Sequence, residues 1–265
     1  MFARLLMACF SLATNAVLAQ DSLMDAEEFV PYSNARQLVV RGNVNVIMGG
    51  DSYLNVIEFD PDEVSIKTLP GDVIEVSPVS LGRHYNMFSN PTVVVRSNNR
   101  FRDLYKIHIR DQGSLVAKDI ESLSLAIDVK TTGSVMVEGV MNLNHLQVVS
   151  ASDVEIYWVD SNNLNVDVFD GNVVLAGRVD FLTMRATDSA SVDAAGLIAN
   201  RSWVAGVGNA RLAVFPREEL FAYTKNNAVI DVKSRPDVYA PLNQAPSSIV
   251  LNYVEMEKRA SAIRR

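Results

Sequence analysis

A turn motif recurs through the second half of the chain at steps of 18 or 20 residues. Each motif is a pair of residues with turn chemistry, mostly Gly, Asp, Asn or Ser, and an alternating apolar pair follows it within a few positions. A repeat of this length constrains the fold strongly, because each repeat is one structural unit that buries its apolar side chains against the next. The turn pairs are Gln112-Gly113, Thr132-Gly133, Ser152-Asp153, Asp170-Gly171, Asp188-Ser189, Gly208-Asn209 and Asn226-Asn227.

The apolar residues between the turns alternate with polar ones, which is typical of β-strands with one buried face. Valine, a β-branched residue that suits a pleated sheet, occurs 37 times in the chain. After each turn the pattern predicts an inward pair: Leu115/Ala117, Val135/Val137, Val154/Ile156, Val173/Leu175, Val192/Ala194, Leu212/Val214 and Ile230/Val232. After a second change of direction it predicts further inward sets: Leu123/Leu125/Ile127, Leu146/Val148, Leu164/Val166/Val168, Leu182/Met184/Ala186 and Trp203/Ala205/Val207.

Turn, strand, corner and strand, repeated seven times, predict an all-β fold, a parallel β-helix or β-solenoid with coils of about 19 residues. Successive coils stack about 4.8 Å apart in such a fold, so equivalent inward side chains form ladders along its axis. The alternative is an antiparallel sandwich, which also has a strand every ~8–12 residues. We favour the solenoid because alternate turns differ in character and each character returns one repeat later.

Composition and pattern divide the chain into segments. Residues 20–36 are a polar, acidic lead-in, and residues 37–236 are predicted to form one β-solenoid domain, less regular over 37–110 and regular over 111–236. Residues 237–265 are expected to form a linker and a tail, in which a short strand over 249–254 caps the open edge of the last coil. The tail is basic at its end, with Lys258, Arg259, Arg264 and Arg265.

The first 19 residues have the pattern of a secretory signal peptide. One charge, Arg4, precedes an apolar run, and the residues around Ala19 fit a cleavage site after that alanine. Leu6-Met7-Ala8-Cys9 resembles a lipoprotein box, but cleavage there leaves an apolar region shorter than the ~7 residues that a signal requires. We therefore expect an exported chain that begins after Ala19 and carries no lipid on Cys9.

Charge and cysteine content exclude several classes of function. With 24 Lys and Arg against 31 Asp and Glu, the net charge is −7, which disfavours binding to nucleic acid. Cys9 is the single cysteine, so a chain cleaved after Ala19 has no disulfide and no thiolate for catalysis or for zinc. No segment after residue 19 approaches the ~18 consecutive apolar residues of a transmembrane span.

The segments GNVNVIMGGD, TTGSVMVEG, SASDVEIYW, FDGNVVLAG, ATDSASVDAAG and GVGNARLAVF resemble the head domain of auto-transporter adhesins, called the GIN domain. The resemblance covers residues 37–236 and lies in the turn and strand patterns. It implies a bacterial, exported β-helical protein of the periplasm or cell surface, with a role in adhesion and no catalytic residues to transfer. The chain departs from a full auto-transporter, because the 29 residues after Pro236 are too few for a translocating barrel.

Three aspartates, Asp153, Asp170 and Asp188, fall in the same column of turns and are a candidate for a calcium site. Ca²⁺ takes about 6–8 oxygen ligands, and stacked carboxylates supply several of them. The simpler interpretation is that Asp is a good turn former whose side chain bonds the local backbone. We expect no resident metal and no other cofactor.

Aromatic residues along the repeats offer a second kind of site. Trp158 and Trp203 are in phase with their apolar neighbours, and we expect both to fill the core. Tyr157 and Tyr223 are out of phase, and we expect them to be exposed as candidates for a binding surface.

The sequence carries no catalytic constellation. His84, His108 and His145 are in separate segments, and neither a G-x-S-x-G elbow nor an H-E-x-x-H motif occurs. We therefore interpret the chain as an exported, non-catalytic β-solenoid, an adhesin-like or envelope-associated binding module whose partner is an envelope component, a glycan or a protein. The alternatives are a structural scaffold of the envelope and a carbohydrate-active β-helix enzyme, which would need charged residues clustered on adjacent coils.

Overall fold

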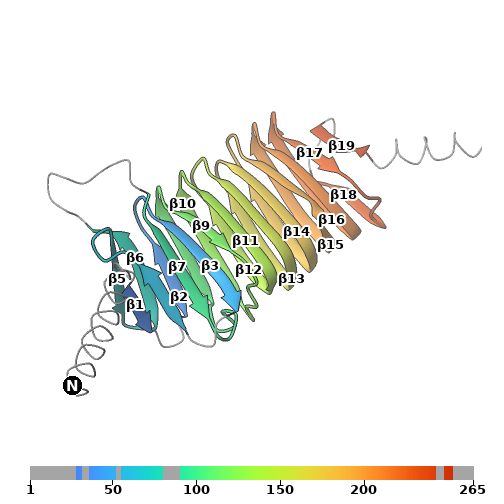
Figure 1. Ribbon diagram of the computed structural model, residues 1–265. Coiled ribbons are helices and arrows are strands. Elements are labelled where there is room, and N and C mark those ends of the chain that lie inside the picture. Colours follow the sequence, from blue (N-terminus) through green and yellow to red (C-terminus); the bar gives the residue numbers. More distant parts are fainter. Residues whose placement is uncertain (1–27, 32–35, 52–54, 80–89, 243–247, 253–265) are drawn as a thin grey trace, which may run out of the picture.

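Long β-strands lie side by side along one axis in the computed structural model, which describes residues 28–31, 36–51, 55–79, 90–242 and 248–252 (Figure 1). Each of the four longest strands pairs in parallel with the next: β13 (Asp153–Val168), β14 (Asn172–Ala186), β15 (Ser191–Gly208) and β16 (Arg211–Asn226). Val154 of β13 lies opposite Val173 of β14, 19 residues further along the chain. The fold is a β-solenoid of about 7 turns, about 19 residues apart, which confirms the predicted class.

Shorter strands precede this central stack. The nearest ones pair in parallel and are β8 (Lys106–Asp111), β9 (Ser114–Ala117), β10 (Leu125–Thr131), β11 (Ser134–Met141) and β12 (Leu143–Val148). The first strands are β1 (Glu28–Pro31), β2 (Gln37–Val40), β3 (Asn45–Asp51), β4 (Val56–Phe59), β5 (Val64–Leu69), β6 (Val73–Pro78) and β7 (Thr92–Ser97). Among these, β4 pairs antiparallel with β1 and β7, and β5 with β6, so the early coils are less regular than the later ones.

Three short strands continue the solenoid beyond Pro236 or close to it: β17 (Val229–Val232), β18 (Val238–Pro241) and β19 (Ile249–Leu251). β16 pairs in parallel with β17 and β18, and β17 pairs in parallel with β19. The strand predicted over 249–254 is thus present in its described part, where it forms one more rung. Residues 253–265 and the predicted cleavage site after Ala19 lie outside the described residues.

The burial pattern of β13 shows how one coil is built. Inward positions alternate as far as Ile156, restart at Val159 and restart again at Leu164. The alternation breaks at two corners, Tyr157-Trp158 and Asn162-Asn163, and a turn over residues 169–171 leads into the next coil. We call the stretches between these breaks, residues 153–156, 159–161 and 164–168 with their equivalents in other coils, the first, second and third faces.

Equivalent inward side chains of successive coils form ladders in the core. In one ladder Val154, Val173, Val192, Leu212 and Ile230 lie opposite one another, and all are buried. Every inward pair predicted for the first face is buried, which confirms that part of the prediction. Burial of apolar surface contributes about 25 cal/mol per Å², so these ladders are the main source of stability in a chain that is expected to lack disulfides.

The predicted phase of β15 is wrong by one residue. Trp203 is 50% exposed, and the buried positions beside it are Ser202 and Val204. Gly206 is one of the true inward positions, and it gives no apolar signal in the sequence. A Cβ on Gly206 would come within 2.9 Å of Leu212 Cδ1, so the core at that position has no room for a side chain. Apolar character therefore gave the wrong inward side for this strand, because the inward positions of this coil include the small residues Ser202 and Gly206.

Two other residues predicted to be inward are exposed because they lie where the alternation breaks. Leu123, between β9 and β10, is 59% exposed, and Trp158, at the first corner of β13, is 64% exposed. A period of two holds only within a straight strand, and each corner resets it.

Glycines at the first corner let successive coils approach closely. Gly177 has a φ of +138°, and a Cβ there would lie 2.1 Å from the carbonyl oxygen of Val159. Gly139 has a φ of +148°, and its Cβ would lie 2.2 Å from the carbonyl oxygen of Ile120. Backbone packs directly on backbone at this corner, which only glycine permits.

Candidate functional site

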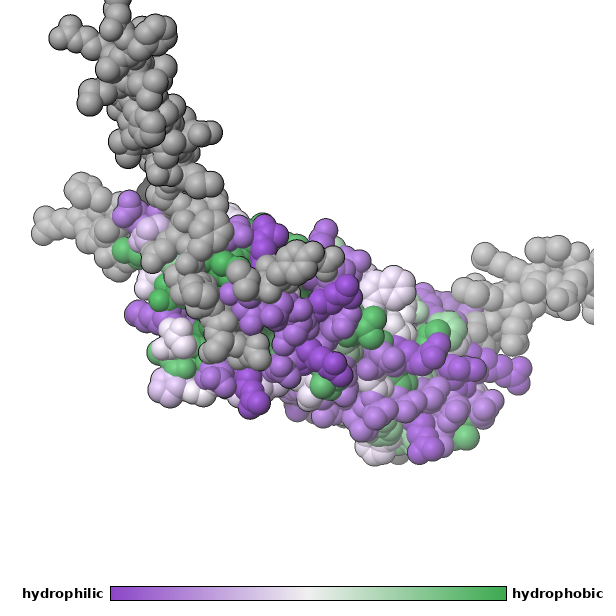
Figure 2. Space-filling view, turned by 60° about the horizontal axis from the view of Figure 1, so that its bottom comes forward, coloured by the Kyte–Doolittle hydropathy of each residue, from purple (hydrophilic) through white to green (hydrophobic). Residues whose placement is uncertain are grey.

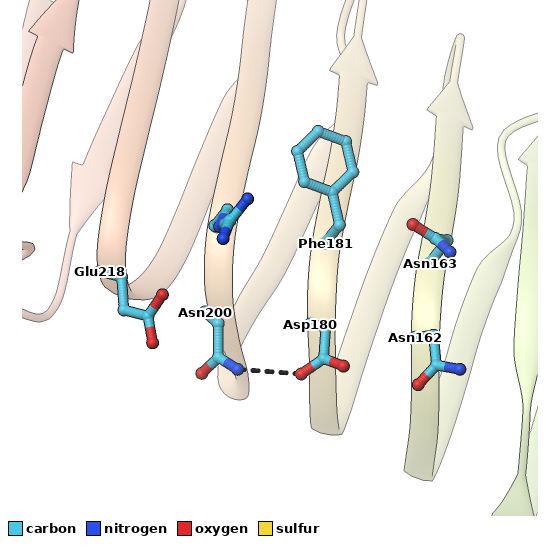
Figure 3. A pocket seen from close by; sticks show the side chains of 7 residues that line it. Asn162, Asn163, Asp180, Phe181, Asn200 and Glu218 are labelled. Carbon is cyan, nitrogen blue, oxygen red and sulfur yellow. Dashed lines mark hydrogen bonds between the residues drawn. The ribbon is translucent and has the colours of Figure 1, made fainter.

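The second corner of four successive coils forms a polar groove of about 490 Å³. Asn162, Asp180, Asn200 and Glu218 stand there, one each on β13, β14, β15 and β16. Figure 3 shows their amide and carboxylate groups in a row across the strands, with Asn200 Nδ2 donating a hydrogen bond of 2.9 Å to Asp180 Oδ1. The row exists because each strand turns at this position and directs its polar side chain outward.

A second row of residues borders the groove, one position further along the strands. Asn163, Phe181, Arg201 and Glu219 lie opposite one another in β13 to β16. Phe181 is half-buried, and its ring stands above the row of polar groups in Figure 3. Arg201 is exposed and adds a cation to a groove that otherwise holds amides and carboxylates.

An aromatic pair continues this region onto the third face. Trp203 lies two residues beyond Arg201 on β15, so both side chains are on the outward side of the strand. The ring centroids of Trp203 and Phe221 are 5.4 Å apart with planes tilted by 39°, a favourable aromatic contact. Tyr223 follows Phe221 by two residues on β16 and is half-buried on the same side. We call Phe181, Arg201, Trp203, Phe221 and Tyr223 the aromatic surface.

The exposure of Trp203 is a cost that a purely structural face does not require. A large aromatic residue stabilises a fold most when it is buried, and exposed groups of large apolar residues mark interaction sites. The face seen in Figure 2 is mostly hydrophilic, with hydrophobic residues in small separate patches. An aromatic pair beside a groove with convergent polar groups has the composition of a ligand-binding surface.

Tyr157 and Tyr223 lie on different faces. Tyr157 is half-buried at the end of the first face, and its hydroxyl donates a hydrogen bond of 2.9 Å to Glu155 Oε2. This hydrogen bond is the main reason why the pKa of Tyr157 is raised. Of the two tyrosines, only Tyr223 therefore belongs to the aromatic surface.

The three turn aspartates occupy different places in their turns. Asp153 lies opposite Asn172, whose Nδ2 donates to Asp153 Oδ1 at 2.9 Å. Asp170 Oδ1 accepts a hydrogen bond of 2.9 Å from the backbone N–H of Gly171, and Asp188 has a φ of +55°. Within the described ranges, no group of three or more His, Cys, Asp or Glu side chains is placed to hold a metal ion.

A charged cluster lies on the third face of the early coils. Asp128 Oδ2 is 3.0 Å from His108 Nδ1 and 3.5 Å from Lys106 Nζ, and Asp128 Oδ1 is 3.8 Å from His145 Nε2. Burial lowers the pKa of His108 more than Asp128 raises it, so His108 is neutral near pH 7. The fold thus brings two of the three histidines to one carboxylate that joins β8, β10 and β12, whereas His84 lies outside the described residues.

Sequence reasoning missed the groove and most of the aromatic surface. The polar pair Asn162-Asn163 interrupts the alternation of β13, and the same interruption one and two repeats later contains Asp180 and Asn200. That interruption is the signal that marks the second corner. Trp203 was missed for another reason: its apolar character led to the prediction that it lies in the core.

Comparison with known proteins gives one family. The family model described as "Putative auto-transporter adhesin, head GIN domain" matches residues 89–236. This range contains the regular coils, the groove and the aromatic surface. No curated protein matches the chain.

Solved structures of bacterial proteins have the same fold. A putative adhesin from Parabacteroides distasonis has a TM-score of 0.65 at 13% identity and covers 85% of this chain and 94% of its own. A putative adhesin from Parabacteroides merdae has a TM-score of 0.64 at 13% identity, with coverages of 85% and 92%. A putative lipid binding protein from Parabacteroides distasonis has a TM-score of 0.61 at 16% identity, with coverages of 86% and 94%. At these identities the likeness concerns the fold alone.

Proposed function

Because the chain belongs to the family of the putative auto-transporter adhesin head GIN domains, we propose that it is an exported module that binds a glycan on its outer surface. The binding site in this proposal is the groove at the second corner together with the aromatic surface. The module acts by adhesion-like binding and not by catalysis, and it needs no cofactor.

The proposal rests on one juxtaposition: the polar groove and the aromatic pair are contiguous on β14, β15 and β16. Arg201 lines the groove and lies two residues from Trp203 on the same side of β15. A sugar ring presents hydroxyl groups around its edge and an apolar C–H face. The amides of Asn162 and Asn200 can both donate and accept hydrogen bonds to hydroxyls, and an aromatic ring can cover the apolar face.

The charges favour an uncharged glycan over an acidic one. Asp180 and Glu218 place two carboxylates in the groove against the single guanidinium of Arg201. The whole chain has a net charge of −7, which repels polyanions at a distance. A neutral oligosaccharide is repelled neither by the carboxylates of the groove nor by the net charge of the chain.

Replacing Trp203 with alanine should reduce glycan binding at least about tenfold, since truncation of an aromatic anchor typically costs more than ~1.4 kcal/mol of binding free energy. The measurement is binding of the purified chain to an array of neutral oligosaccharides, followed by titration of the strongest ligand. Trp158→Ala is the matched control, because it removes the other exposed tryptophan and should leave binding unchanged. Equal affinity of Trp203→Ala and the parent chain, or the absence of any bound neutral glycan, contradicts the proposal.

Export to the cell surface is part of the proposal. The described residues contain no helix long and apolar enough to cross a membrane. Protease treatment of intact cells should degrade a chain displayed on the surface, whereas a cytoplasmic marker stays intact. Survival of the chain until the outer envelope is opened indicates a periplasmic scaffold instead.

A further inference from the structure

An exposed apolar patch lies on the earlier coils, away from the aromatic surface. It consists of Trp158 and Val140, each 64% exposed, and Leu123, 59% exposed. Two adjoining hollows surround it: one of about 270 Å³ is lined by Trp158 and Val140, and one of about 560 Å³ is lined by Val140 and Leu123. We call these three residues the Trp158 patch. Large apolar side chains gathered at a surface are unfavourable unless something covers them.

Trp158 is also strained. Its φ is +66°, in the left-handed region that is unfavourable for a bulky residue, whereas the first corners before and after it contain Gly139 and Gly177. Strain and exposure thus fall on the same side chain. Residues that carry both kinds of cost are concentrated at binding sites.

Negative charge surrounds the patch. Glu121 is paired with Arg100 at 2.6 Å, and no ion pair to the other carboxylates of the two hollows occurs among the described residues. The charged residues that line the hollows are Asp119, Glu121, Glu138, Asp160, Arg100 and Arg102. With four carboxylates against two guanidinium groups, an occupant that combines apolar side chains with positive charge fits this region.

We propose that residues 253–265 of the chain bind to the Trp158 patch. This segment has the chemistry that the patch lacks, apolar side chains combined with an excess of positive charge. Its apolar side chains include Val254, Met256 and Ile263, and its charged ones are Glu255, Glu257, Lys258, Arg259, Arg264 and Arg265. The two arginines at its end, Arg264 and Arg265, face the carboxylates of the hollows, and Ile263 lies against Trp158.

The path of the chain brings the segment to the correct side of the solenoid. β19, the last described strand, lies on the first face, which in β13 leads into the corner that contains Trp158. Five parallel pairings, about 24 Å at ~4.8 Å each, separate β19 from β13. They run through Ile249, Ile230, Leu212, Val192, Val173 and Val154. Thirteen extended residues reach up to about 43 Å, so the end of the segment, Ile263 to Arg265, reaches Trp158 within one chain, whereas Val254 and Met256 are too close to β19 to do so.

Quenching of Trp158 fluorescence tests the proposal in the full chain. The chain has 2 tryptophans, so Trp203→Phe makes Trp158 the single reporter. Adding Arg264→Glu and Arg265→Glu should raise the acrylamide quenching constant of Trp158 at least about twofold, because repulsion releases the segment. The matched control reverses two exposed cations outside the segment, Arg211→Glu with Lys225→Glu, and should leave the constant unchanged.

A synthetic peptide of residues 253–265 provides the second arm. Added to the Arg264→Glu, Arg265→Glu chain, it should restore protection of Trp158 and should fail to do so in 0.5 M salt, which screens exposed charge. If protection of Trp158 in the parent chain persists on dilution, the segment binds to its own chain. If protection is lost at the dilution at which sedimentation shows a dimer dissociating, the segment binds to a neighbouring copy, which overturns binding within one chain. Equal quenching in the parent and charge-reversed chains, or a peptide without effect, overturns the proposal.

Discussion

Replacing Gly177 with alanine is expected to lower the free energy of unfolding by about 3 kcal/mol or more. The new Cβ would lie 2.1 Å from the carbonyl oxygen of Val159, an atom of the backbone that cannot rotate away. The φ of +138° is in addition a conformation that an L side chain rarely adopts. Relief requires the two coils to separate at the first corner, which weakens the hydrogen-bond ladder on both sides of it.

Gly71→Ala is the control for this substitution. Gly71 also has a positive φ, +87°, but nothing lies within 4 Å of the position of its Cβ. Its replacement introduces the backbone strain without the clash and should lower the free energy of unfolding by about 1 kcal/mol. Urea denaturation followed by circular dichroism measures both variants, and losses of equal size contradict direct packing of backbone on backbone at the first corner.

Leu182→Ala is expected to cost about 3–5 kcal/mol, toward the upper end for a leucine in a core. Leu182 is buried and lies opposite Leu164 on one side and Ser202 on the other. Ser202 is already small, and its buried Oγ has no hydrogen-bond partner among the described residues. Removal of the leucine next to it leaves two small residues in a row, so Ser202 cannot fill the cavity.

Leu123→Ala provides the comparison, since repeat position alone predicts both leucines to be inward. Leu123 is exposed, and its truncation should change the free energy of unfolding by no more than about 0.5 kcal/mol. The same denaturation experiment serves for both. If the two variants lose similar stability, the assignment of inward and outward positions is wrong.

The first face of each coil was the part of the fold best predicted from sequence. Val154 and Ile156, like their equivalents in other coils, are apolar residues two positions apart directly after a turn, and the turn fixes where the alternation starts. The spacing of those turns also gave the coil length, because stacked coils must keep their corners in register. Local pattern and global repeat agree in this region, and both lead to the same architecture.

The third face of β15 was predicted in the wrong phase because the size and polarity of its side chains suggest the opposite orientation. Ser202 and Gly206 look like surface residues, and Trp203 looks like a core residue. The small residues nevertheless point inward, because side chains of neighbouring coils already fill the space around Gly206 in the narrow core. Only the packing of three coils together contains that information.

The candidate site is spread over several coils and was therefore hard to predict. Asn162, Asp180, Asn200 and Glu218 are separated by about one repeat each and share no local motif. They become neighbours only when the second corners are aligned. Outward positions of a solenoid carry little structural constraint, so a binding surface can form there without leaving a periodic signal.

Hydroxyl-radical footprinting of the aromatic side chains tests the binding surface most directly. The chain is oxidised alone and with the oligosaccharide that binds best on the array, and each modified Trp, Phe and Tyr is quantified by mass spectrometry. We expect the bound glycan to protect Trp203 and Phe221 and to leave the oxidation of Trp158 unchanged. A ligand that binds while Trp203 and Phe221 stay as reactive as before would show that the glycan is held elsewhere and would contradict the account.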